Sequence, residues 1–119
     1  MKHILAILVL CATAATANAA APKVEDASAR QTGATWTVSV TLSHPDTGWD
    51  HYADGWEVLA PDGTNLGLRV LVHPHVDEQP FTRSLAGVTI PEGVKTIRIR
   101  ARCLVDGWNA DTYEVALPD

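Results

Sequence analysis

The sequence predicts an all-β protein, a single antiparallel sandwich of seven strands preceded by an N-terminal signal peptide. Apolar residues recur at every second position through most of the chain, and no segment shows the 3.6-residue period of a capped amphipathic helix. Turn signals rich in Gly, Pro and Asp separate these runs. The length of 119 residues allows one domain and excludes a TIM barrel, a multidomain enzyme and a full dinucleotide-binding fold.

Residues 1–19 have the features of a secretory signal peptide. A basic start is followed by an apolar run over residues 4–12, which is too short to span a bilayer because a spanning helix needs about 20 residues. The tripeptide Ala-Asn-Ala that ends at Ala19 has the small-x-small pattern that signal peptidase recognises. The alternatives are an uncleaved anchor and lipidation at Cys11, although a leucine precedes Cys11 where lipoprotein signals use a small residue. We therefore expect cleavage near Ala19 and a periplasmic or secreted domain over residues 20–119.

Without this leader, the composition is that of an acidic domain with one cysteine. Lys2 leaves with the leader, so 8 of the 9 basic residues and all 14 acidic residues remain, and the net charge is −6. This charge argues against nucleic acid or an anionic membrane surface as a partner. Cys103 is then alone, so no intramolecular disulfide can form, and we expect no membrane span in the mature chain.

The first four predicted strands follow from the alternation of apolar residues. Residues 23–30 alternate weakly, which is typical of an edge strand, and residues 34–43, 52–60 and 66–72 alternate clearly. The residues that share a face are Trp36, Val38, Val40 and Leu42 in the second strand, Trp56, Val58 and Ala60 in the third, and Leu66, Leu68, Val70 and Val72 in the fourth.

The last three predicted strands cover residues 81–90, 95–103 and 112–117. In the first of these the alternation changes phase at Gly87, which predicts a β-bulge. The residues that share a face in the other two are Ile97, Ile99, Ala101 and Cys103, and then Tyr113, Val115 and Leu117. We expect Cys103 to be a buried free thiol, with a metal contact or an intermolecular disulfide as the alternative.

Several segments resemble fibronectin type III domains. Residues 55–58 (Gly-Trp-Glu-Val) are similar to the strand C of that family, in which an aromatic residue follows glycine, and Trp36 is similar to its strand-B tryptophan. Residues 88–93 and the alternating run 97–101 are similar to its E–F corner and strand F. The resemblance implies an Ig-like or fibronectin-III-like β-sandwich.

Three connecting segments, residues 44–51, 73–80 and 104–111, are expected at one end of this sandwich because antiparallel strands alternate in direction. They hold all four histidines of the mature chain, and binding residues usually lie on loops held by a rigid scaffold. Residues 44–51 and the His-Pro-His of residues 73–75 also resemble small secreted bacterial proteins of unknown function, a resemblance that implies no chemistry. The candidate ligand-binding residues are His44, Asp46, Trp49, Asp50, His51, His73, His75, Asp77, Glu78 and Trp108.

Binding is the function that these loops favour, with a protein, a peptide or a small ligand such as a glycan as the partner. The alternative is a divalent transition-metal site for Cu or Zn built from His51, His73 and His75, since imidazole suits both metals. Loop histidines that bond only to backbone groups or to a neighbouring aspartate are the structural alternative. The mature chain has no Met and no Cys–His–Met loop, which argues against a blue-copper site. The single mature cysteine excludes a structural zinc site built on cysteines, and no cofactor is certain.

Catalysis is the weaker alternative, as a small hydrolase. His51 with Asp50 or Asp54, and Ser84 or Thr82 as the nucleophile, can be written as a triad. The sequence contains no Gly-x-Ser-x-Gly, no phosphate-binding loop and no His-Glu-x-x-His, so nothing favours this reading.

The basic residues of the strands have a structural interpretation. Arg98, Arg100 and Arg102 form a stripe on the outward face of one strand, and Glu57 and Glu114 are expected to pair with it across the sheet. Arg83 is likewise expected to pair with Asp77 or Glu78 and to anchor the loop that carries them.

Overall fold

The computed structural model describes residues 21–119, so the predicted signal peptide lies outside the described residues. Within this range the chain forms strands and no helix, and no segment could cross a membrane as a helix. The strands are β1 (Lys23–Thr32), β2 (Thr35–Ser43), β3 (Ala53–Leu59), β4 (Asn65–Val70), β5 (Phe81–Val88), β6 (Thr96–Cys103), β7 (Gly107–Trp108) and β8 (Tyr113–Ala116).

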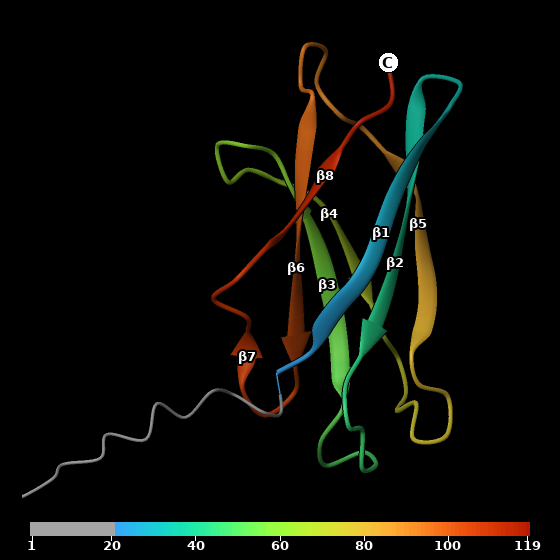
Figure 1. Cartoon of the computed structure of the whole chain (residues 1–119), viewed down its shortest axis with the longest axis vertical. Coiled ribbons are helices and arrows are strands. Elements are labelled where there is room, and N and C mark those ends of the chain that lie inside the picture. Colours follow the sequence, from blue (N-terminus) through green and yellow to red (C-terminus); the bar gives the residue numbers. More distant parts are fainter. Residues whose placement is uncertain (1–20) are drawn as a thin grey trace, which may run out of the picture.

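The strands form two antiparallel sheets (Figure 1). One sheet has three strands in the order β1-β2-β5. The other has five strands, in which β4, β3 and β6 lie in that order and both β7 and β8 pair with β6. The all-β, antiparallel prediction is therefore confirmed for the described residues.

The two sheets share one hydrophobic core. It contains Val38, Val40 and Leu42 from β2, Trp56 and Val58 from β3, Phe81 and Val88 from β5, and Ile97, Ile99 and Ala101 from β6. Trp56 is completely buried, as its place in the alternation predicts. An aromatic residue of this size removes roughly 150–250 Å² from water, so it is a large part of the stabilising burial.

The number of strands differs from the prediction. Residues 21–119 form eight strands where seven were expected, and the additional strand, β7, lies in the segment 104–111 that was predicted to be a loop. Gly107 and Trp108 pair with Cys103 and Arg102, and Gly107 has a φ of +75°, which a glycine adopts without steric cost. Two residues are too few for a periodic pattern, so the alternation could not reveal this strand.

The edge strand β4 presents two of its apolar residues to solvent, while Leu66 is partly buried against the core. Leu68 and Val70 are 49% and 56% exposed, whereas Leu71 just beyond the strand is buried. A Cβ placed on Gly67 would lie 2.8 Å from Cδ2 of Leu85 in the opposite sheet, so the glycine allows the two sheets to approach closely here. Leu66, Leu68 and Val70 alternate on one face of β4, but Leu71 just beyond the strand has the opposite parity and is the buried residue, so alternation alone does not show which face is buried.

The bulge predicted at Gly87 is confirmed. Along β2 and β5, Trp36 pairs with Val88 but Val38 pairs with Leu85, so β5 has one more residue than β2 between these pairs. Gly87 has a φ of +70°, in the region that such a bulge requires. The bulge restores the inward direction of Val88, which is buried in the core.

The two ends of the protein differ in chemistry. The β1–β2 and β5–β6 turns lie at the upper end in Figure 1, and the β2–β3, β4–β5 and β6–β7 connections lie at the lower end. The lower end holds all four histidines of residues 21–119, as the strand directions predict.

Candidate metal centre

Asp46 ties together the segments at the lower end of the protein. Its carboxylate is buried, with the residue 6% exposed. Oδ1 accepts hydrogen bonds from Nδ1 of His44 at 2.5 Å and from the backbone N–H of Ala53 at 3.0 Å, and Oδ2 accepts one from the backbone N–H of His75 at 2.8 Å. These three donors satisfy a buried charge that would otherwise be costly, so Asp46 connects the β2–β3 loop to β3 and to the β4–β5 loop.

The bond to Asp46 determines how His44 presents its imidazole. The carboxylate can only accept, so Nδ1 carries the proton, and in the neutral ring Nε2 then carries a lone pair. The side chain of His44 is fully buried, and Nε2 has no hydrogen-bond partner among residues 21–119. A buried, unpaired acceptor is rare in native proteins and calls for a partner such as an ordered water or an ion; Nδ1 of His75, outside this group, is in the same position.

His51 and Cys103 meet His44 at this point. The rings of His44 and His51 lie edge to face, with centroids 4.8 Å apart, and Nε2 of His51 is also buried without a partner among the described residues. Cys103 is a free, completely buried thiol at the end of β6. One ligand atom from each of the three residues lies within 4.8 Å of the other two.

This spacing suits three ligands around one ion after a small adjustment. With metal–nitrogen distances of about 2.0 Å and a metal–sulfur distance of about 2.3 Å, the ligand atoms of a bound ion lie about 3.5 Å apart. The three ligand atoms lie within 4.8 Å of one another, so the set must contract by at most about 1.3 Å between any two of them to reach that spacing. Imidazole and thiolate are the ligands that Zn and Cu prefer.

Local backbone structure brings His51 back toward His44. The N–H of Thr47 donates to the carbonyl of His51 at 3.0 Å, and the N–H of His51 donates to the carbonyl of Gly48 at 3.2 Å. Gly48 has a φ of +148°, which L side chains rarely adopt. The resulting tight turn returns the chain to β3, where Ala53 pairs with Cys103.

The other two histidines form a separate pair. The rings of His73 and His75 are 4.6 Å apart, but the cluster that lies within ligand distance contains neither of them. His75 is buried, stacks on Phe81 with ring centroids 3.9 Å apart, and accepts a hydrogen bond at Nε2 from Arg83 at 2.9 Å. Burial, assisted by the charge of Arg83, lowers the pKa of His75 and favours the neutral ring.

The exposed histidine of the pair has a local contact. His73 donates from Nδ1 to the carbonyl of Pro74 at 3.0 Å. Arg83 also pairs with Glu78 at 3.1 Å, which confirms one of the two partners expected for it. The β4–β5 loop is therefore anchored through His75, Glu78 and Arg83.

The remaining predicted site residues lie apart from the cluster. Trp49 is 66% exposed and meets Tyr52 edge to face, and Asp50 and Asp77 are exposed. The ring of Trp108 lies beneath the guanidinium groups of Arg100 and Arg102, 5.2 Å and 5.7 Å from its centroid. Arg100 also pairs with Glu57, which was an expected partner, and Arg102 pairs with Asp54. The two arginines therefore have the structural role that their place on the sheet predicts.

The hydroxyl residues and the histidine of the hypothetical triad have different neighbours. Oγ of Ser84 is hydrogen-bonded to Oγ of Ser39 at 2.7 Å, and Oγ1 of Thr82 to Oγ1 of Thr41 at 2.7 Å, across the β2–β5 pair. Both hydroxyls are exposed, whereas His51 directs its ring toward His44 and Cys103.

Sequence reasoning selected His51 for a metal site and kept a metal contact as an alternative for Cys103, but it grouped His51 with His73 and His75 and did not include His44 among the metal ligands. The alternation contains a signal that points to both. His44 continues the inward-facing series of Val40 and Leu42, and Cys103 continues that of Ile99 and Ala101. Two potential ligands that end inward-facing series at the same end of two sheets are candidates for one buried site.

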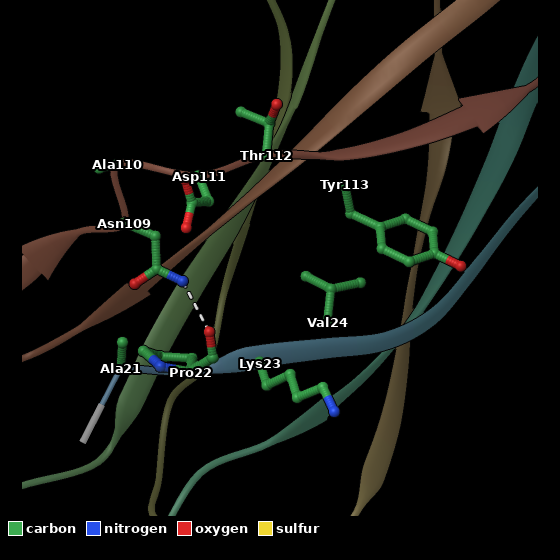
Figure 2. A pocket seen from close by; sticks show the side chains of 9 residues that line it. All are labelled: Ala21, Pro22, Lys23, Val24, Asn109, Ala110, Asp111, Thr112 and Tyr113. Atoms are coloured by element: carbon green, nitrogen blue, oxygen red, sulfur yellow. Dashed lines mark hydrogen bonds between the residues drawn. The ribbon is translucent and has the colours of Figure 1, made fainter. Parts of the chain in front are cut away.

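A pocket of about 520 Å³ lies elsewhere, between the start of β1 and residues 109–113 (Figure 2). Nδ2 of Asn109 donates to the carbonyl of Pro22 at 2.6 Å across one side of it. Its lining includes none of the histidines and not Cys103, so the pocket is distinct from the metal cluster.

Comparison with known proteins gives one informative similarity. No family model and no solved structure matches the chain. A protein of Halomicrobium mukohataei named "Putative lipoprotein" is 40% identical to it over 77 residues, which is 65% of this chain and 37% of that protein. The chain therefore spans little more than a third of the length of this relative.

Proposed function

We propose that the protein binds one transition-metal ion, Zn or Cu, through His44, His51 and Cys103. The observation that carries the proposal is the pair of buried imidazole Nε2 atoms that lack partners within residues 21–119, next to a buried thiol. Leaving such groups unpaired costs about 1–3 kcal/mol each, and a bound ion removes that cost.

The surroundings of the ligands support this function. Metal-binding histidines usually donate their second ring N–H to a carboxylate or a carbonyl, which fixes the ring and raises its basicity. Asp46 does this for His44, while its other hydrogen bonds fix the carboxylate itself. Both oxygens of Asp46 are therefore engaged, which makes it a positioning residue for the site.

The proposed location is extracytoplasmic. It is supported by the signal-peptide features of residues 1–19 and by the name of the Halomicrobium relative. We also propose that the two sheets form a fibronectin-III-like sandwich, since their strand orders, β1-β2-β5 and β4-β3-β6-β8, give the layer arrangement that such a domain requires.

Metal titration tests this function. The purified, reduced protein should bind one Zn²⁺ with a dissociation constant below about 1 μM, because the three donors include a thiolate and two of them are held in place by the sheet and by Asp46. His51→Ala and Cys103→Ala each remove one ligand and should weaken binding at least about 100-fold, whereas His73→Ala, a change at an exposed histidine outside the cluster, should bind as the wild type does. Binding weaker than about 10 μM by the wild type, or full affinity in folded Cys103→Ala, contradicts the proposal.

A second candidate function is binding of a protein or peptide at the same end. The exposure of Trp49, Val72 and Val105, each more than 60% exposed on three different connections, favours it. Partner capture from a periplasmic extract should be lost in Trp49→Ala and retained in Leu68→Ala, which changes an exposed apolar residue on the edge strand β4. Equal capture by both variants contradicts a partner site around Trp49.

A further inference from the structure

The proposed metal site contains three ligands and no obvious fourth. The cluster of His, Cys, Asp and Glu side chains within ligand distance, among residues 21–119, consists of His44, His51 and Cys103. The nearest carboxylate, that of Asp46, already accepts three hydrogen bonds. Structural zinc sites are almost always four-coordinate, whereas a trigonal set of two imidazoles and one thiolate is typical of copper that transfers electrons.

The burial of the ligand atoms also favours copper over zinc. Zinc held by three protein ligands completes its shell with water or substrate in the fourth position. Here both Nε2 atoms are buried, and Cys103 has no exposed surface. Copper does not need the additional water, since the axial ligand of its trigonal sites is weak and distant and can be a backbone oxygen.

The fixed positions of two ligands are also suited to a copper ion that changes between two oxidation states. Cys103 lies at the end of β6 in register with Ala53, and Ala53 donates to the same carboxylate that holds His44. Two of the three ligands are therefore fixed by the sheet and by Asp46 before any metal binds. A preorganised site changes little between Cu(II) and Cu(I), which reduces the reorganisation that accompanies electron transfer.

We propose, resting on the metal-binding function above, that the ion is copper and that the site is a one-electron centre. On binding, the Cys103 thiol loses its proton to solvent and forms a copper–sulfur bond, while each histidine donates an Nε2 lone pair. Cu(II) then takes one electron from an external one-electron donor to become Cu(I). It returns that electron to a one-electron acceptor, and Cys103 remains a thiolate ligand throughout.

The half-buried ligand indicates where electrons pass. His51 is the most accessible of the three ligands, and Trp49, two residues before it, is largely exposed. Leu104 and Val105, which follow Cys103, are exposed as well. A redox partner that docks on this end of the protein would therefore approach the metal through the side of His51.

Anaerobic titration with Cu(II) tests the inference. The reduced protein should take up one copper and develop an intense visible band from charge transfer between thiolate and Cu(II). One electron equivalent of ascorbate should remove the band, and ferricyanide should restore it. Cys103→Ser should lack the band, and His73→Ala should keep it, because His73 lies outside the cluster.

A second measurement separates this inference from the metal-binding function. Copper should displace bound zinc completely at a one-to-one ratio, with an affinity at least about 100-fold higher. The copper inference falls if Zn²⁺ binds through Cys103 but Cu(II) gives no band, or if Cu(II) only oxidises the thiol to a disulfide between two chains. If neither metal binds, the metal-binding function falls with it.

Discussion

Asp46 shows how one side chain determines the local chemistry at the residue scale. It is buried and charged, and such a group is tolerated only with several strong hydrogen bonds. Its three donors come from His44, Ala53 and His75, so one carboxylate orients a metal ligand and joins two loops. Sequence reasoning placed Asp46 among the site residues as a ligand contact, but it could not show that the side chain turns inward.

Asp46→Asn should therefore weaken both folding and metal binding. The amide keeps the shape but has one acceptor oxygen and no charge, so at least one donor loses its partner. We expect the free energy of unfolding to fall by about 2–3 kcal/mol and zinc affinity to fall about 10–100-fold. Urea unfolding of the metal-free protein and a competition titration measure the two effects.

Asp62→Asn is the matched control for this substitution. Asp62 is exposed and accepts one hydrogen bond, from the N–H of Thr64 at 3.0 Å in the β3–β4 turn. We expect a loss below about 1 kcal/mol and no change in zinc affinity. Equal losses in the two variants would show that Asp46 has no special role.

The depressed pKa of His75 predicts a dependence of stability on pH. Burial and the charge of Arg83 lower this pKa in the folded protein below the ordinary value of 6.5. The unfolded chain then binds more protons as pH falls, so the contribution of His75 to stability is present above pH 6.5 and is lost below it. Metal-free wild type should lose stability between about pH 7 and pH 5 more steeply than His75→Gln. An equal slope in the two proteins over this interval would contradict the contribution of His75.

At the scale of single elements, the β1–β2 hairpin shows what a local pattern can predict. Thr32 pairs with Thr35, which leaves Gly33 and Ala34 as a two-residue turn. Gly33 has a φ of +64°, whereas no residue other than glycine has a positive φ within residues 21–119. This arrangement is that of a type II′ turn, which uses glycine at its first central position.

Gly33→Ala should destabilise the protein through this turn. Alanine at a positive φ is strained, so we expect a loss of about 1 kcal/mol in the free energy of unfolding. Ala34→Ser, at the neighbouring exposed position, should change it by less than about 0.5 kcal/mol. Chemical unfolding measures both, and a neutral Gly33→Ala would rule out the strained turn.

The strands themselves were largely predictable because alternation is a local property. The bulge at Gly87 was predictable for the same reason, since the phase of the alternation changes there. The exposed face of β4 was not, because it depends on how closely Gly67 lets the opposite sheet approach. The short β7 was missed because its existence depends on pairing with Arg102 and Cys103 rather than on its own two residues.

At the scale of the whole molecule, the candidate site results from the register of two sheets. Strand direction was enough to predict that the histidines gather at one end. The specific cluster needs more, because His44 directly follows β2 in one sheet while Cys103 ends β6 in the other. Distances between residues so far apart in the chain depend on sheet packing, which no local pattern encodes.

Metal binding should stabilise the entire fold, because the three ligands belong to segments that are separated in the unfolded chain. At a free zinc concentration 100 times the dissociation constant, the stabilisation is about 2.7 kcal/mol, provided that the unfolded chain does not bind. For a protein of this size we expect the melting temperature to rise by about 10 °C or more. Cys103→Ala should show less than a third of that rise under the same conditions, and an equal rise would contradict the cluster.

The most direct test of the central claim is X-ray absorption spectroscopy of the zinc-loaded protein. The account predicts one sulfur neighbour at about 2.3 Å and two imidazole nitrogen neighbours at about 2.0 Å from the metal. The sulfur should disappear in Cys103→Ala. A metal environment of nitrogen and oxygen alone in the wild type would contradict a site built from His44, His51 and Cys103.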